Sequence, residues 1–117
     1  MLKKQLDISY PIGYNYDIMI VRETDNFKNW LRGLKDRMAR SIINARIRRL
    51  SLGNKGDTKP VGGRVSELRI DYGPGYRVYY YQAKREIIIL LCGGDKSSQS
   101  KDIEDAKKIV ESLEVEE

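Results

Sequence analysis

The stretch "EIIILLC", residues 86–92, limits the folds open to this chain more than any other feature. A short apolar run without alternation is typical of a strand that is central in its sheet or covered on both faces. The two preceding segments, "RVSELRIDY" and "YRVYYY", carry strand-forming residues and are joined by "GPG" at 73–75, which predicts a tight hairpin. Together the three segments predict an antiparallel three-stranded meander.

The first half of the chain predicts a strand followed by helix. "YDIMIV", 16–21, has the composition of a strand, and Thr24 or Asp25 can cap the helix that follows. Gly33 and "LKDR" leave two possibilities, one long helix or two antiparallel helices, between which periodicity does not decide. The apolar stripe of this region consists of Phe27, Leu31, Leu34, Met38, Ile42, Ile43, Ile47 and Leu50.

The remaining segments predict two loops and a final helix. Residues 51–63 and 93–102 are rich in turn formers, and Ser100 or Asp102 can cap a C-terminal helix. The expected fold class is therefore α+β: a small antiparallel-rich sheet of an N-terminal strand plus the meander, an N-terminal helix or helix hairpin, and a C-terminal helix. We expect one domain over 16–117, a loosely ordered extension over 1–15, and helices on one face of the sheet only.

Composition narrows the class of protein. The chain has 117 residues, a net charge of +5, no histidine and one cysteine, Cys92, so no internal disulfide can form. No signal peptide is visible, and the longest apolar run is too short to span a bilayer, so we expect a soluble cytoplasmic protein. Residues 27–59 hold ten Lys/Arg against two Asp, a local net charge of +8, which indicates a polyanionic partner or simply a solvated helix face.

Three strings, "GNKGD", "ELRIDYGPGYRVYY" and "LLCGGDKSSQ", occur in an order and spacing that resemble a known family. The chain resembles the RelE/HigB-like toxins of bacterial toxin–antitoxin modules, and more narrowly the branch of phage-derived addiction-module killer proteins. The resemblance runs from about residue 16 to about residue 112. It implies a RelE-like fold, a cognate antitoxin protein as partner, and action on mRNA in the decoding site of the ribosome.

The activity that the resemblance implies is that of an endoribonuclease, an mRNA interferase that inhibits translation. Such enzymes use no metal and no other cofactor, and the ribose 2′-hydroxyl attacks the scissile phosphate. The arginine of "GYR", Arg77, then contacts that phosphate, and Arg69 in "ELRI" and Lys96 in "GGDKSS" accompany it. Glu67 stands where some relatives have lysine, and the histidine or tyrosine that some relatives carry near the C-terminus has no counterpart here.

The chemistry of RNA cleavage by a 2′-hydroxyl requires groups of the same kinds. Attack by a 2′-hydroxyl needs a base, positive charge around the developing phosphorane, and an acid for the leaving 5′-oxygen. Arg69 and Arg77 would share the exposed sheet face with Glu67, the candidate base, while Lys96 is the candidate acid. Without a histidine we expect a weak intrinsic nuclease that depends on substrate geometry imposed by the ribosome.

Further side chains are expected to bind RNA, and Tyr79 would offer its ring for base stacking. An alternative stays open: a catalytically silent RNA- or antitoxin-binding module of the same fold. If the protein is the enzyme, loss of Arg77 abolishes cleavage with little change in RNA affinity. If it is the binding module, there is no cleavage to lose. Its RNA affinity then survives the loss of Arg77, because phosphate contacts add across the basic surface. The expected RNA-binding residues are Lys55, Lys59, Arg64, Tyr79 and Gln99.

Overall fold

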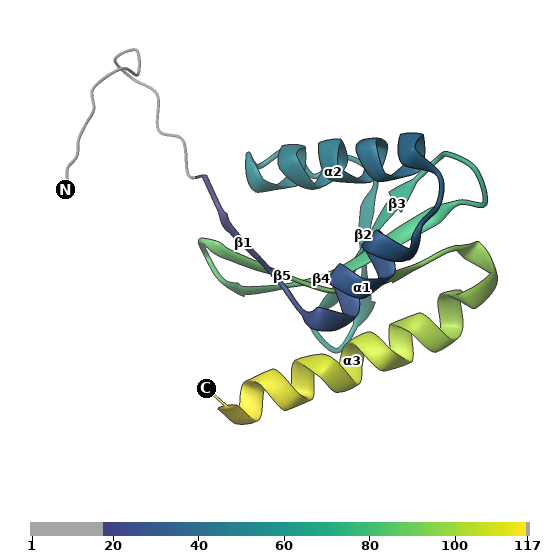
Figure 1. Cartoon of the computed structure of the whole chain (residues 1–117). Coiled ribbons are helices and arrows are strands. Elements are labelled where there is room, and N and C mark those ends of the chain that lie inside the picture. Colours follow the sequence, from purple (N-terminus) through teal and green to yellow (C-terminus); the bar gives the residue numbers. More distant parts are fainter. Residues whose placement is uncertain (1–17, 117) are drawn as a thin grey trace, which may run out of the picture.

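The computed structural model describes residues 18–116, and the side chains of residues 18–113. Five strands form one mixed sheet in the order β1-β5-β4-β3-β2 (Figure 1). β1 pairs parallel with β5, and the other pairs are antiparallel, so the predicted α+β class and the meander β3-β4-β5 are confirmed. The extension predicted over 1–15 lies outside the described residues. The strands are β1 (Ile20–Glu23), β2 (Thr58–Gly62), β3 (Val65–Ile70), β4 (Tyr76–Lys84) and β5 (Ile87–Gly94).

The N-terminal helical region is a pair of helices, α1 (Asp25–Gly33) and α2 (Arg37–Ser51). Each has its own cap: the side chain of Thr24 accepts from the Phe27 amide at 3.1 Å, and that of Asp36 accepts from the Ala39 amide at 3.1 Å. A second capping residue thus starts a second helix only three residues after the first helix ends. Of the two possibilities that the periodicity left open, the helix pair is the one that forms.

Helices cover both faces of the sheet, so the expectation of helices on one face only is wrong. α1 and α2 bury Phe27 and Ile43 against Leu68 and Leu90 on one face. α3 (Gln99–Glu116) crosses the opposite face, on the other side of the sheet from α2 in Figure 1. Burial of the hydrophobic side chains that α3 covers stabilises this layer. They are Val65, Tyr79, Tyr81, Leu91 and Cys92, packed against Ala106 and Val110.

The predicted loop over 51–63 contains a strand that the turn-forming residues concealed. Residues 58–62 form β2, the edge strand beside β3. Pro60 is compatible with this position because an edge strand has one side on which no amide donor is needed. Gly62, Gly63 and Arg64 all have positive φ angles and make the turn into β3. None of the helices in residues 18–116 is long and apolar enough to cross a membrane.

Candidate functional site

An open cleft of about 310 Å³ lies at the end of the sheet where β3 ends and β4 begins. Its wall combines the end of β3, the β3-β4 turn, the start of β4, the residue before β2 and the short 3-10 helix η1 (Lys96–Ser98). Three cations and two carboxylates line it, so the cleft carries a net positive charge. The lining residues are Asp57, Arg69, Ile70, Asp71, Gly75, Arg77 and Lys96.

The three cations named from the sequence meet in this wall. Arg69 and Arg77 are direct cross-strand partners in the antiparallel β3-β4 pair, so their side chains leave the same face of the sheet. Gly94 is the partner of Arg77 on β5, and the chain continues from there into η1, which carries Lys96. Strand register therefore brings together residues that are 27 positions apart, from 69 to 96.

Arg77 is held from two sides, and its side chain is only 11% exposed. Its Nε lies 3.9 Å from Oε2 of Glu67, and its Nη1 donates to the carbonyl oxygen of Gly75. Gly75 has φ +80°, and a Cβ built there would lie 2.8 Å from Arg77 Nη1. The turn therefore requires glycine both for its backbone conformation and for the room that the guanidinium occupies.

Glu67 shares the face of Arg77 but is fully buried, so the expectation that it lies on an open face is wrong. Its Oε2 accepts hydrogen bonds from the Tyr79 hydroxyl at 3.2 Å and from Nε2 of Gln99, the first residue of α3, at 2.8 Å. α3 covers this part of the sheet and leaves only its end, beyond Glu67, as the cleft. Glu67 therefore stands behind the wall and not in it.

Tyr79 offers no surface on which a base can stack. Its ring is fully buried under α3, and its hydroxyl donates to Glu67. Burial, followed by the charge of Glu67 and this hydrogen bond, raises the pKa of Tyr79 above its usual value of 10. Alternation along β4 had placed Tyr79 on the correct face, but that face is covered at its position.

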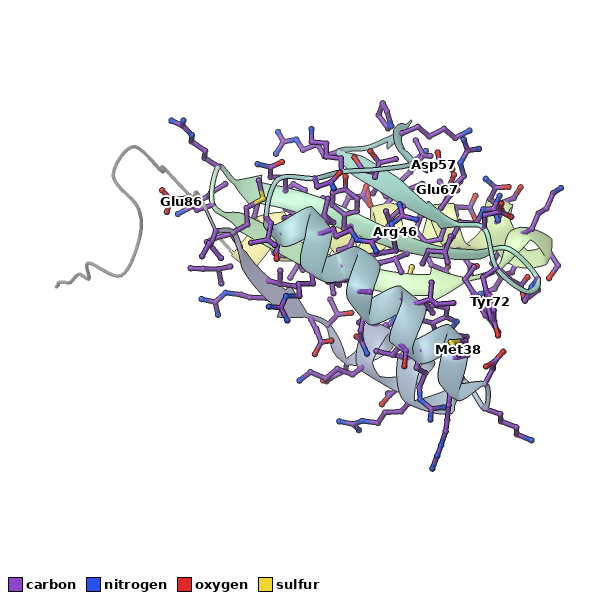
Figure 2. The ribbon with its side chains drawn as sticks, turned by 90° about the horizontal axis from the view of Figure 1, so that it is seen from above. Met38, Arg46, Asp57, Glu67, Tyr72 and Glu86 are labelled. Atoms are coloured by element: carbon purple, nitrogen blue, oxygen red, sulfur yellow. The ribbon has the colours of Figure 1, made fainter. Side chains whose placement is uncertain are left out.

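Arg69 is held by Asp57, a residue that the sequence interpretation missed. Arg69 Nη2 lies 3.2 Å from Asp57 Oδ1, and the Arg69 amide donates to the Asp57 carbonyl at 2.9 Å. Arg46 of α2 donates from Nη1 to the Arg69 carbonyl at 3.1 Å and so connects α2 to the end of β3 (Figure 2). Asp57 is the last letter of "GNKGD", so the string itself was the available signal. Asp71, the other missed carboxylate, directly follows β3.

Lys96 is exposed at the rim of the cleft, in the first position of η1. Asp95 caps this turn: its Oδ1 accepts from the Ser97 amide at 2.8 Å and from the Ser97 hydroxyl. The hydroxyl bond, followed by the amide bond, lowers the pKa of Asp95 below its usual 3.8. The loop therefore has a defined shape that presents Lys96 beside the two arginines.

The remaining residues predicted to bind RNA lie outside the cleft wall. Lys55, Lys59 and Arg64 are exposed, on the loop before β2, on β2 and on the β2-β3 turn. Arg64 precedes Arg69 by five positions, roughly 17 Å along an extended strand at ~3.4 Å per residue. Gln99 is half-buried and bonded to Glu67. Among the side chains that the structure describes, those of residues 18–113, no three of His, Cys, Asp or Glu come together as metal ligands would.

Comparison with known proteins finds a family whose sequence model spans this cleft. The model of the family described as "Phage derived protein Gp49-like (DUF891)" matches residues 29–114, a range that contains the whole cleft. A protein of Haemophilus influenzae described as uncharacterized is 50% identical over 93 residues, which are 80% of this chain and 94% of that protein. The similarity therefore extends over nearly the full length of the relative.

Proposed function

We propose, because the chain belongs to the Gp49-like family of phage-derived proteins, that it is a toxin that cleaves mRNA on the ribosome. Membership of this family suggests a toxin of the toxin–antitoxin type. The finer assignment, a type II toxin acting as a RelE/HigB-like mRNA interferase, is our proposal. One observation carries it: Arg69, Arg77 and Lys96 converge in one open cleft.

The cleft suits a phosphodiester in several respects. An arginine presents a planar fork that meets two phosphate oxygens at once, and two arginines and a lysine can neutralise the charge that develops on the phosphorane. In the proposed reaction the ribose 2′-oxygen forms a bond to phosphorus and the bond from phosphorus to the 5′-oxygen breaks. The products are a 2′,3′-cyclic phosphate and a 5′-hydroxyl.

The proton acceptor in this scheme comes from the cleft wall. Glu67 is buried, and Asp57 is paired with Arg69. Asp71 is exposed in the wall and belongs to none of the ion pairs found among the described residues. We assign the 2′-hydroxyl proton to Asp71 and the donation to the leaving 5′-oxygen to Lys96.

The proposed partners are the ribosome with its mRNA and a cognate antitoxin, all in the cytoplasm. The outer surfaces of α1, α2 and the connection between them support a polyanionic partner, because the cations there are exposed to solvent. They are Lys28, Arg32, Lys35, Arg37, Arg48 and Arg49. Binding through such a surface is sensitive to salt, since each phosphate contact releases a counterion.

One observation favours a second candidate, a catalytically silent RNA- or antitoxin-binding module. The burial of Glu67 removes one acid–base group from the cleft, and the chain contains no histidine to replace it. The two candidates separate on cleavage, because a silent module binds RNA without cutting it.

The test is single-turnover cleavage of a message held in the decoding site. Arg77→Ala is expected to lower the rate by ~10²-fold or more, and Arg77→Lys to recover little, because lysine keeps the charge but loses the fork. Arg85→Ala is the matched control, an exposed arginine at the opposite end of β4. Wild-type cleavage by Arg77→Ala would contradict the assignment of the cleft, and no cleavage by the wild-type chain would favour the silent module.

A further inference from the structure

Glu67 is the fully buried charged residue directly behind the cleft, and its surroundings come from three different elements. It lies on β3, accepts from Tyr79 on β4 and from Gln99 at the start of α3, and faces Arg77 Nε at 3.9 Å. Asp57 lines the cleft and Glu67 is fully buried, and Figure 2 shows the two residues in the same part of the sheet. A carboxylate in such a place is costly to bury, so its partners have to compensate for the lost water.

We infer that Glu67 is a positioning residue that orients the guanidinium of Arg77 toward the scissile phosphate, and that it is not the base of the reaction. The inference deepens the proposed function and rests on it, because it names what prepares the phosphate-binding arginine. It assigns to Glu67 a role that depends on its charge and on its fixed position, and not on the transfer of a proton to or from substrate.

The number of N–H groups on a guanidinium explains how Glu67 can orient Arg77. A guanidinium has five N–H groups in one plane. In Arg77 the Nε side faces Glu67, and one Nη1 group donates to the Gly75 carbonyl. The groups left over belong to the Nη end, which is the end that makes a paired contact with two phosphate oxygens. Glu67 and Gly75 thus determine which edge of Arg77 meets the ligand.

The position of Glu67 is itself determined by its neighbours. Tyr79 and Gln99 both donate to Oε2, at 3.2 Å and 2.8 Å, so the carboxylate is tied to β4 and α3. Oε1 has no hydrogen-bond partner among the described residues, and neither does Arg77 Nε. The pair is therefore an ion pair over 3.9 Å, close enough for a strong orienting field in a buried place.

The decisive measurement is a double-mutant cycle on binding, with a single-stranded 2′-O-methyl oligoribonucleotide as the probe. This probe cannot be cleaved, so the result does not depend on nuclease activity or on the ribosome. Glu67→Gln keeps the shape of the side chain and removes its charge. With a probe short enough to contact the cleft alone, rather than the whole basic surface, we expect Glu67→Gln to weaken binding roughly tenfold in wild type and to have no further effect in the Arg77→Ala background. Independent, additive effects of the two substitutions would overturn the inference.

Cleavage on the ribosome supplies the second readout. If Glu67 positions Arg77, Glu67→Gln lowers the rate but the pH–rate profile keeps its form. If Glu67 is the base, Glu67→Gln binds the probe at the wild-type level, and the limb of the pH–rate profile that reports titration of the base disappears. Absence of cleavage by the wild-type chain would refute the proposed nuclease function, while the binding cycle would still decide the role of Glu67.

Two milder variants keep the test valid if Glu67→Gln does not fold. Tyr79→Phe and Gln99→Ala each remove one donor to Glu67, and each is expected to weaken probe binding several-fold, again only when Arg77 is present. Glu104→Gln, at an exposed position on α3, is the matched control and should bind like wild type. Melting temperatures of all variants identify any loss that is due to unfolding. Wild-type binding by both milder variants would overturn the inference.

Discussion

The Arg69 guanidinium and the Asp57 carboxylate form an ion pair at the mouth of the cleft, with Nη2 and Oδ1 3.2 Å apart and the two side chains 38% and 57% exposed. An ion pair in so exposed a place is worth only ~0–1 kcal/mol. A phosphate that offers two oxygens can therefore displace Asp57 from Arg69. We therefore expect an RNA phosphate to take the place of the Asp57 carboxylate beside Arg69.

Asp57→Asn is accordingly expected to bind a non-cleavable oligoribonucleotide several-fold more tightly than wild type, because Arg69 is released and a repelling charge is removed. The backbone bond from the Arg69 amide to the carbonyl of residue 57 is kept. Fluorescence anisotropy at low salt measures the effect, and Glu104→Gln controls for the loss of one negative charge. Weaker binding by Asp57→Asn would mean that Asp57 serves to hold Arg69 in place.

Gly75→Ala is expected to impair cleavage by displacing Arg77. Gly73→Ala is its matched control: both glycines have positive φ, but a Cβ at Gly73 meets only the Tyr76 ring, at 3.4 Å, whereas one at Gly75 lies 2.8 Å from Arg77 Nη1. Both variants should lose about 1–2 kcal/mol of stability through backbone strain. Only Gly75→Ala should lose cleavage, by ~10-fold or more. Equal rates in the two variants would show that the room beside Arg77 is unimportant.

Cys92 is expected to be inert in the folded protein. Burial, followed by the charges of Asp102 and Asp105, raises the pKa of its thiol to about 12, and the residue is only 8% exposed. The thiol therefore stays protonated at pH 8, far below the raised pKa, and the reactive thiolate is scarce. An aromatic disulfide reagent should modify Cys92 only at the rate of unfolding. Rapid stoichiometric modification without denaturant would contradict this.

Because Asp36 caps α2, the folding stability of the protein should decrease at acidic pH. Asp36 accepts from the Ala39 amide and from the Tyr72 hydroxyl at 2.9 Å, and these bonds, the amide first, lower the pKa of Asp36 below 3.8. Figure 2 shows Tyr72 beside the start of α2, near Met38. Because the folded pKa is the lower one, the stabilisation is complete above the unfolded value of 3.8 and is lost as pH falls through the folded pKa.

Asp36→Asn keeps a capping side chain but cannot titrate, so its melting temperature should fall less steeply than that of wild type as pH drops below 4. Asp36→Ala should melt lower than both at neutral pH. Tyr72→Phe keeps the cap while removing one of the two bonds, and should shift the acid transition slightly upward. Parallel curves for Asp36→Asn and wild type would rule out Asp36 as a source of the acid sensitivity.

Local sequence patterns were sufficient to predict much of the fold. Alternation in "ELRI" and "YRVYYY" assigned side chains to faces, and "GPG" predicted the hairpin, whose register in the structure brings Arg69 opposite Arg77. The cap at Thr24 was among those expected from the sequence, whereas the cap at Asp36, which separates the two helices, became clear only in the structure. The predicted features depend on residues close together in sequence, which is why sequence reasoning reaches them. Two of the three cleft cations follow from the hairpin register, and Lys96 follows from the β4-β5 pairing.

Only the tertiary structure decided what covers each face. A period of two shows that Glu67, Arg77 and Tyr79 share a face, but it does not show whether another element lies on that face. The return of α3 across the sheet buries Glu67 and Tyr79 and leaves Arg77 at the uncovered end. The run "IIILLC" carried part of this information, since β5 is apolar toward both helical layers. Where a layer ends depends on helix length and docking, and these are settled by contacts between segments far apart in the chain.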